Sequence, residues 1–99
     1  MIEIRHTDRD NKGVFSLLAS GQPAGELTYH HAGKGVIIID HTGVPSSYGG
    51  LGYGKQLVKA TVEYARQKEL KVIAHCSFAQ AVISKTPEYR DVLEDPSAR

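Results

Sequence analysis

The stretch VIIIDHTGVPSSYGGLGYGKQLVKATVEYA, residues 36–65, decides the fold because it joins the most apolar strand of the chain to its most regular helix. Residues 36–39 are the longest apolar run, which predicts a central strand covered on both faces. The helix should start near Gly52 and fade by Lys68, because apolar residues recur there at spacings of one, three and four. This apolar stripe consists of Leu57, Val58, Thr61, Val62 and Ala65.

The residues before this stretch predict three further strands. Alternating apolar and polar side chains at residues 2–6 indicate a half-buried strand, and β-formers at residues 26–31 indicate another. The expected strands cover residues 2–6, 14–19, 26–31 and 36 to about 44, and the expected turns cover residues 8–13, 20–23 and 32–35. We therefore expect four strands in succession.

The residues after this stretch predict one more strand and a helix. A short strand at residues 71–75 is expected beside the fourth strand, followed by a helix at residues 77–85 with Ser77 as its N-cap. Pro87 can open a further helical turn through Leu93, and the polar tail at residues 94–99 should fray. The sequence thus predicts one α/β domain over residues 1–99, with helices packed on a mixed sheet and one right-handed crossover.

The composition excludes several classes of protein. Twelve basic and eleven acidic residues leave no electrostatic footprint for nucleic acid or an anionic membrane. The longest apolar run is far too short to span a bilayer, and residues 1–5 lack the pattern of a signal peptide. A single cysteine excludes an internal disulfide and a cysteine-based zinc site. We expect a cytoplasmic single domain, too small for a two-domain dehydrogenase or a kinase.

The segment GGLGYGK, residues 49–55, predicts an anion site. A glycine-rich turn at a helix start exposes backbone N–H groups at the positive end of the helix dipole, so a phosphate or pyrophosphate is the expected ligand. The alternative is a turn that only allows close packing. The phosphate-binding loop of nucleotide hydrolases is excluded because Gln56 stands where that loop needs a magnesium-binding hydroxyl. The dinucleotide-binding fingerprint is excluded because Lys55 stands where it needs its last glycine.

A strand, this glycine loop and then a long helix resemble motif A of the GCN5-related N-acetyltransferase (GNAT) superfamily. Gly52 and Gly54 match the small positions of that motif, whereas Gly49 stands where the family commonly has Gln or Arg. The segments at residues 40–44, 76–79 and 87–89 extend the likeness to a minimal branch that covers nearly the whole chain. The resemblance implies that the fourth and fifth strands are parallel and splay apart to form a cleft.

The resemblance also implies acetyl-coenzyme A (acetyl-CoA) as cosubstrate, with no metal. Loop amides from Leu51 to Lys55 would bind the pyrophosphate, and Thr42 and Val44 would offer backbone groups to the pantetheine arm. The implied cofactor-binding residues are Thr42, Val44, Gly49, Gly50, Leu51, Gly52, Tyr53, Gly54, Lys55, Ser77, Phe78 and Ala79. Tyr48, beside the glycines, can also stack near the cofactor.

The family's usual catalytic pair is missing from this chain. No carboxylate precedes Asp40 on the fourth strand, and Ile83 stands at the position of the usual tyrosine acid. His41 is a candidate base because histidine titrates near neutral pH, and Cys76 is a candidate acetyl acceptor. The alternatives are a histidine bonded to a loop and a small buried hydrophobe. A zinc site at His41, His75 and Cys76 lacks a fourth ligand.

Three functions follow from these residues. The first is an N-acetyltransferase that passes acetyl directly, in a ternary complex, to a small-molecule or protein amine of unknown identity. The second is a non-catalytic CoA or acyl-CoA binding module, which the missing Glu and Tyr favour. The third is an interaction domain without ligand. The resemblance implies that the strands that shape the acceptor site in larger relatives are absent here, so we expect that site to be open or to be completed by a second subunit in a homodimer.

Overall fold

The computed structural model describes residues 2–33 and 35–93, so the tail expected at residues 94–99 lies outside the described part. The elements are β1 (Ile2–Arg9), β2 (Lys12–Ala19), β3 (Gln22–His31), β4 (Val36–Gly43), the 3₁₀ turn η1 (Ser46–Tyr48), α1 (Tyr53–Gln67), β5 (Lys71–Ala74), α2 (Ser77–Ser84) and the 3₁₀ helix η2 (Pro87–Val92). The expected order of strands and helices is confirmed.

The five strands form one mixed sheet in the order β1-β2-β3-β4-β5. The first four strands pair antiparallel, and β5 pairs parallel to β4. A parallel pair needs a crossover connection, and α1 supplies it. The predicted mixed sheet with parallel fourth and fifth strands is therefore confirmed.

The first two turns are tighter than expected. β1 and β2 are joined by Asp10 and Asn11 alone, with φ angles of 55° and 71°, and β2 and β3 by Ser20 and Gly21, with φ angles of 50° and 82°. Two residues with positive φ form a hairpin turn that matches the twist of its strands. The strands therefore run further than predicted, and the turns expected at residues 8–13 and 20–23 were wrong in extent.

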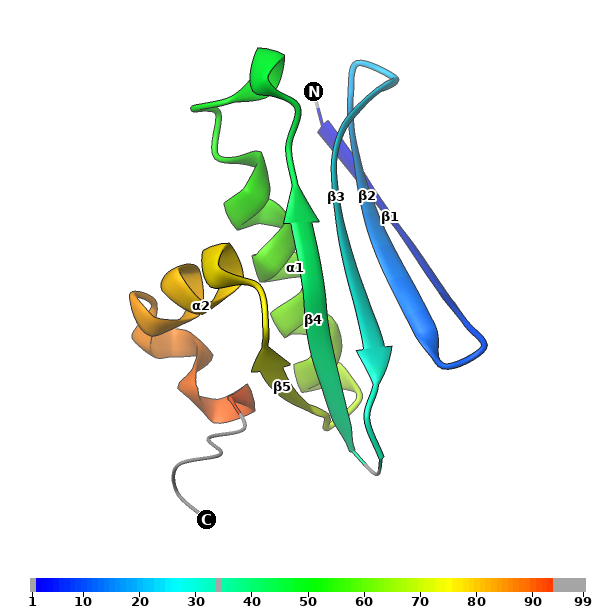
Figure 1. The fold of residues 1–99 in the computed structure, drawn as a ribbon, viewed down its shortest axis with the longest axis vertical. Helices are drawn as coiled ribbons and strands as arrows, with labels where there is room; N and C mark the ends of the chain where they lie inside the picture. Colours follow the sequence, from blue (N-terminus) through cyan, green and yellow to red (C-terminus); the bar gives the residue numbers. More distant parts are fainter. Residues whose placement is uncertain (1, 34, 94–99) are drawn as a thin grey trace.

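The core lies between the sheet and α1, which contacts β2, β3, β4 and β5. In β4, Ile37 and Ile39 are fully buried on this side, whereas Val36 and Ile38 point to the other side and are half-buried. Figure 1 shows α1 behind the sheet and no described helix in front of β1–β4. The prediction that residues 36–39 are covered on both faces was wrong. We call the face opposite α1 the open face.

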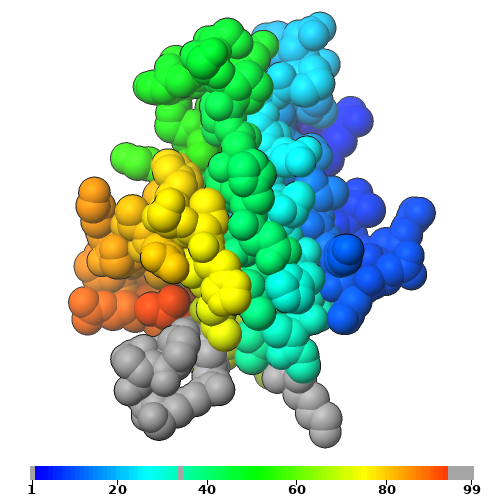
Figure 2. Space-filling view, in the orientation of Figure 1, coloured from blue at the N-terminus to red at the C-terminus, as the bar shows by residue number. Residues whose placement is uncertain are grey.

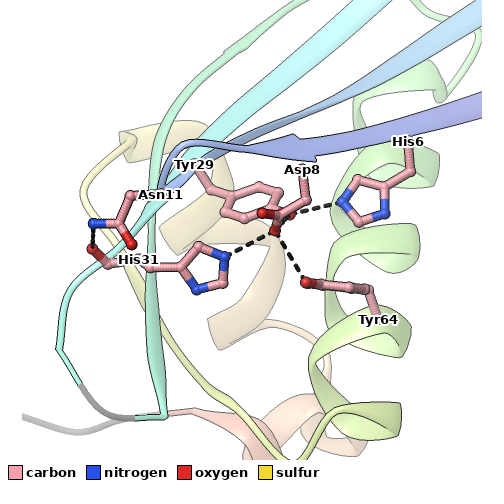
Figure 3. Close-up of polar contacts among 6 residues, drawn as sticks. All are labelled: His6, Asp8, Asn11, Tyr29, His31 and Tyr64. Atoms are coloured by element: carbon pink, nitrogen blue, oxygen red, sulfur yellow. Dashed lines mark hydrogen bonds and ion pairs between the residues drawn. The ribbon is translucent and has the colours of Figure 1, made fainter.

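A polar cluster pins β1 and β3 to α1 on the covered face (Figure 3). The Asp8 Oδ2 atom accepts hydrogen bonds from the Tyr29 hydroxyl at 2.6 Å, the His31 Nε2 at 2.8 Å and the Tyr64 hydroxyl at 3.0 Å. His6 lies 2.7 Å from the Tyr29 hydroxyl. Burial raises the pKa of Tyr29 and lowers that of His6. The cluster joins the first hairpin to the helical layer.

The second helix, α2, begins at Ser77, so its N-cap lies one residue earlier than expected. Cys76, not Ser77, is the N-cap residue of α2. Pro87 opens η2 as predicted, and a parallel bridge from Leu93 to Val72 brings the end of η2 against β5. In the described part of the chain, no helix has the length and apolar character required to cross a membrane.

Candidate functional site

The glycine loop leads from the end of β4 into the N-terminus of α1. Gly50 and Gly52 both have φ angles of 80°, a left-handed conformation that only glycine adopts without strain. Gly52 is the N-cap of α1, and its carbonyl accepts the Gln56 backbone N–H at 3.1 Å. The glycines are therefore needed to turn the chain into the helix.

The N-terminus of α1 has no side-chain cap. Gly52 offers no side chain to the first-turn amides, and the first turn holds no acidic residue. An α-helix leaves its first N–H groups without intrahelical partners, and its dipole places positive potential at that end. Lys55 lies in the same turn and adds a positive charge. These features suit an anion.

A pocket of about 440 Å³ opens in front of this helix end. Its lining residues are Thr42, Val44, Tyr48, Gly49, Gly50, Gly52, Tyr53, Gly54, Lys55 and Phe78. Nine of these ten were expected from the sequence as cofactor residues, and the tenth, Tyr48, was expected to stack nearby. The other three expected residues do not line the pocket: Leu51 is 59% exposed, Ala79 is fully buried in the core, and Ser77 is exposed.

The wall of the pocket is set by a close contact between the two helix starts. A Cβ atom added at Gly54 would lie 2.7 Å from the Phe78 ring. The first turn of α1 therefore lies against the Phe78 ring, and a side chain at position 54 would require that ring to move. Phe78 remains 40% exposed, so its ring forms part of the pocket surface.

Cys76 lies beside Thr42, between the end of β4 and the start of α2. Burial raises the pKa of its thiol, but hydrogen bonds from the backbone of Ala79 and Phe78 act in the opposite direction, and the pKa is below its ordinary value. The Thr42 Oγ1 atom is itself buried and, among the described residues, has no partner that satisfies ordinary hydrogen-bond geometry. The thiol is free and half-buried, and Cys76 is not among the residues that line the pocket.

His41 lies on the open face, away from the pocket. Its register partner is Thr28, whereas the next residue, Thr42, pairs with Leu27, whose side chain is buried against α1. His41 lies over Gly43 and borders a separate hollow with Glu26. Strand alternation therefore separates the two candidate catalytic residues, with Cys76 beside Thr42 and His41 on the open face.

A histidine–aspartate pair near the end of β4 was missed by the sequence reasoning. The His30 Nδ1 atom lies 2.9 Å from both carboxylate oxygens of Asp40. The only sequence feature that pointed to this contact was the turn expected at residues 32–35, because it makes β3 and β4 neighbours. A β-bulge decides the contact, because Thr28 pairs with His41 and Tyr29 with Ile39, which leaves Asp40 as the extra residue.

No group of three or more metal-ligating side chains has the geometry of a metal site within residues 2–33 and 35–93. The only cysteine described is free and half-buried.

The family model described as GCN5-related N-acetyl-transferase matches residues 14–92. Among curated proteins, Protein NATD1 of Homo sapiens is 33% identical over 86 residues, which cover 87% of this chain and 75% of that protein. Protein NATD1 of Gallus gallus is 29% identical over 86 residues, which cover 87% of this chain and 77% of that protein. These relatives align with most of the chain.

Solved structures give the same result. A GCN5-like protein of Staphylococcus aureus, solved by NMR, is 42% identical with a TM-score of 0.72, covering 93% of this chain and 87% of that one. A ribosomal-protein-alanine N-acetyltransferase of Brucella melitensis shares the fold with a TM-score of 0.73 at 10% identity, over 86% of this chain and 90% of that one. A Bacillus anthracis protein described as a streptothricin acetyltransferase, solved with acetyl-CoA, has a TM-score of 0.60 at 19% identity, over 68% of this chain and 39% of that one.

Proposed function

The chain belongs to the GCN5-related N-acetyltransferase family, and from this we propose that it uses acetyl-CoA to acetylate an amine. The observation that carries the proposal is the glycine loop at the uncapped N-terminus of α1, which faces a pocket lined by nine of the expected cofactor residues. The acceptor in this proposal is an amine on a small molecule or a protein. A single free thiol at the site suits the reducing cytoplasm, where we place the protein.

The residues present fit the cosubstrate. A pyrophosphate needs N–H donors, positive potential and close approach of the backbone, and Gly52, Gly54 and Lys55 supply these without a competing carboxylate. The half-exposed aromatic rings of Tyr53 and Phe78 give the pantetheine arm an apolar wall. Thr42, which lines the pocket, offers a buried hydroxyl beside the thiol of Cys76.

We infer direct transfer from the thioester to the amine. Cys76 lies beside Thr42, which lines the pocket, and the lowered pKa of its thiol keeps the covalent route as the alternative. Direct transfer requires that the acceptor reach the thioester without passing through the pocket that holds the cosubstrate, and no described helix covers β1–β4 on the open face (Figure 1).

A binding module without catalysis is the second candidate function. One observation favours it: Ile83, at the position of the family's usual tyrosine acid, is 3% exposed and packs in the core. A buried isoleucine offers no proton to a leaving thiolate. Turnover of acetyl-CoA with a panel of amines separates the two functions, because a binding module would release no CoA.

Titration calorimetry with acetyl-CoA tests the cofactor site. We expect wild-type protein to bind and Gly52→Val to lose binding, because a branched side chain would disturb the left-handed turn and cover the amides. Gly21→Val is the matched control, since Gly21 has a φ of 82° and, like Gly52, has no atom within 4 Å of an added Cβ. Equal loss of binding in both variants, or no binding by wild-type protein at millimolar acetyl-CoA, would contradict the proposal.

Cys76→Ala tests the choice between direct and covalent transfer. We expect the variant to bind acetyl-CoA and to keep most of its transferase rate, because direct transfer needs no acyl-enzyme. Mass spectrometry after incubation with acetyl-CoA checks this independently. One added acetyl group in wild-type protein that disappears in Cys76→Ala, together with loss of turnover, would establish the covalent route instead.

A further inference from the structure

The open face carries an ordered pair of titratable side chains outside the glycine-rich pocket. His30 on β3 and Asp40 on β4 are joined at 2.9 Å through the His30 Nδ1 atom, and their side chains are 38% and 42% exposed. The pair therefore faces solvent while its geometry is fixed. Figure 2 views the molecule from the side of this face, where β3 and β4 lie next to each other.

The contact fixes the chemical role of each ring nitrogen. Because Nδ1 donates its proton to the Asp40 carboxylate, the neutral His30 ring carries its free lone pair on Nε2. A carboxylate that holds one nitrogen of histidine, and so orients the other toward a substrate, is the arrangement that makes histidine an effective base. His41 has no such partner in the side-chain hydrogen bonds of the described residues.

Asp40 lies where β4 and β5 separate, and His30 reaches it from β3, on the side of β4 away from β5. The last register pair between these strands is Ile39 with Ala74, and the His75 backbone N–H still donates to the Ile39 carbonyl at 3.0 Å. Beyond this point the chain turns away into α2. Asp40 is the next residue of β4, and the bulge gives it no register partner on β3.

The pocket begins two residues further along the same strand, at Thr42. Thr42 belongs to the covered face, and His30 and Asp40 belong to the open face. An acyl group held in the pocket and an amine on the open face would therefore meet at the gap between the strands, with His30 on the amine's side.

Resting on the proposed function, we propose that His30, oriented by Asp40, is the base that deprotonates the acceptor amine. The ammonium group of the acceptor gives one proton to the His30 Nε2 atom. The neutral amine then forms a bond to the thioester carbon, the carbon–sulfur bond breaks, and the leaving thiolate takes up the remaining proton that the nitrogen loses. The imidazolium returns its proton to water. Asp40 is a positioning residue, since it acts only through His30.

His30→Ala tests this role when it is measured against His31→Ala. His31 is the adjacent residue, points to the covered face, and also loses a histidine–aspartate contact of 2.8 Å, to Asp8, when replaced. CoA release is measured with spermidine, lysine and a peptide with a free N-terminus. We expect His30→Ala to lower kcat at least about 100-fold with unchanged acetyl-CoA affinity, and added imidazole to restore part of the rate. His31→Ala should keep its kcat.

Asp40→Asn separates positioning from direct action. It keeps the shape of the side chain but loses the carboxylate, so kcat should fall less than in His30→Ala, without rescue by imidazole. A His30→Ala rate within about threefold of wild type, loss without imidazole rescue, or loss together with acetyl-CoA binding would overturn the inference. Wild-type protein that binds acetyl-CoA but acetylates none of the three amines would also overturn it and leave the cofactor site intact. Failure of wild-type binding would instead reject the proposed function itself.

Discussion

At the scale of single residues, Asp8 shows how one carboxylate joins three elements. Three donors converge on its Oδ2 atom, from β3 and from α1 (Figure 3). The hydrogen bond from Tyr29, and those from His31 and Tyr64, lower the pKa of Asp8 to about 2. A carboxylate with a lowered pKa stabilises the folded state while it is ionised, so its contribution is complete at neutral pH.

Asp8→Asn is expected to reduce the free energy of unfolding by about 1–2 kcal/mol at pH 7, since Asp8 is partly exposed. The sign follows from the lowered pKa: wild-type protein loses this stabilisation as the pH falls from about 4 through 2. Urea unfolding between pH 2 and 7 measures the difference, which should shrink toward the acid end. Asp10→Asn, in the neighbouring turn, is the control because asparagine also tolerates a positive φ. A difference that does not depend on pH would contradict this account.

The glycine loop could be predicted from the sequence, whereas the His30–Asp40 contact could not. The glycines from 49 to 54 were recognisable because their spacing is local and their conformational freedom is a property of the residue type. The His30–Asp40 contact was not recognisable, because it depends on a bulge in β4 that shifts register by one residue. Neither histidine nor aspartate has a local pattern that marks such a shift.

At the scale of elements, the pairing of β2 with β3 depends on a missing side chain. Gly13 is the register partner of Tyr29, and a Cβ atom added at Gly13 would overlap the Tyr29 ring. That ring is 1% exposed and its hydroxyl is tied to Asp8 and His6, so it has no free space to move into. The absence of a side chain at Gly13 allows the Tyr29 ring to lie directly over the backbone of β2.

Gly13→Ala is therefore expected to destabilise the fold by about 2 kcal/mol or more, because overpacking at a fixed ring forces the strands apart. Gly43→Ala is the matched control in another strand. Its added Cβ would meet only the Nε2 end of the exposed His41 ring, which can rotate away, so a change below about 0.5 kcal/mol is expected. Thermal unfolding of both variants measures this difference in stability. Equal stability of the two variants would contradict the prediction, because it would show that the Tyr29 ring can move away from position 13.

The sequence predicted the buried face of α1 correctly but not the ends of the first three strands. The apolar stripe of α1 was predicted correctly, since Leu57, Val58, Thr61, Val62 and Ala65 are all buried. The hairpins were underestimated, because Asp10 and Ser20 adopt positive φ without being glycine. Polar residues in a two-residue turn look like the beginning of a longer loop, and only pairing across the turn shows that the strands continue.

At the scale of the whole molecule, the error over β4 explains the location of the proposed chemistry. Residues 36–39 are continuously apolar, a pattern typical of strands buried on both faces. In the structure, only the α1 side is sealed, and Val36 and Ile38 are half-buried on the open face. Neighbouring strands also shield the side chains of a central strand, so an apolar run does not require a helix on each face. The sequence alone therefore did not show that one face of β4 is accessible. That accessible face is where the acceptor is proposed to arrive.

The strands lie in the sheet in the order in which they occur in the chain. No strand has to be inserted between two that are already paired, and the connections between β1, β2 and β3 are two residues long. During synthesis, each strand can therefore pair with the one before it as soon as it emerges from the ribosome, at a small entropic cost of loop closure. Only β5 must wait, for α1. The glycine loop emerges when β4 already has its partner on β3, and the pocket is complete only when α2 follows and adds Phe78 to its lining, so the binding site is assembled after the antiparallel strands.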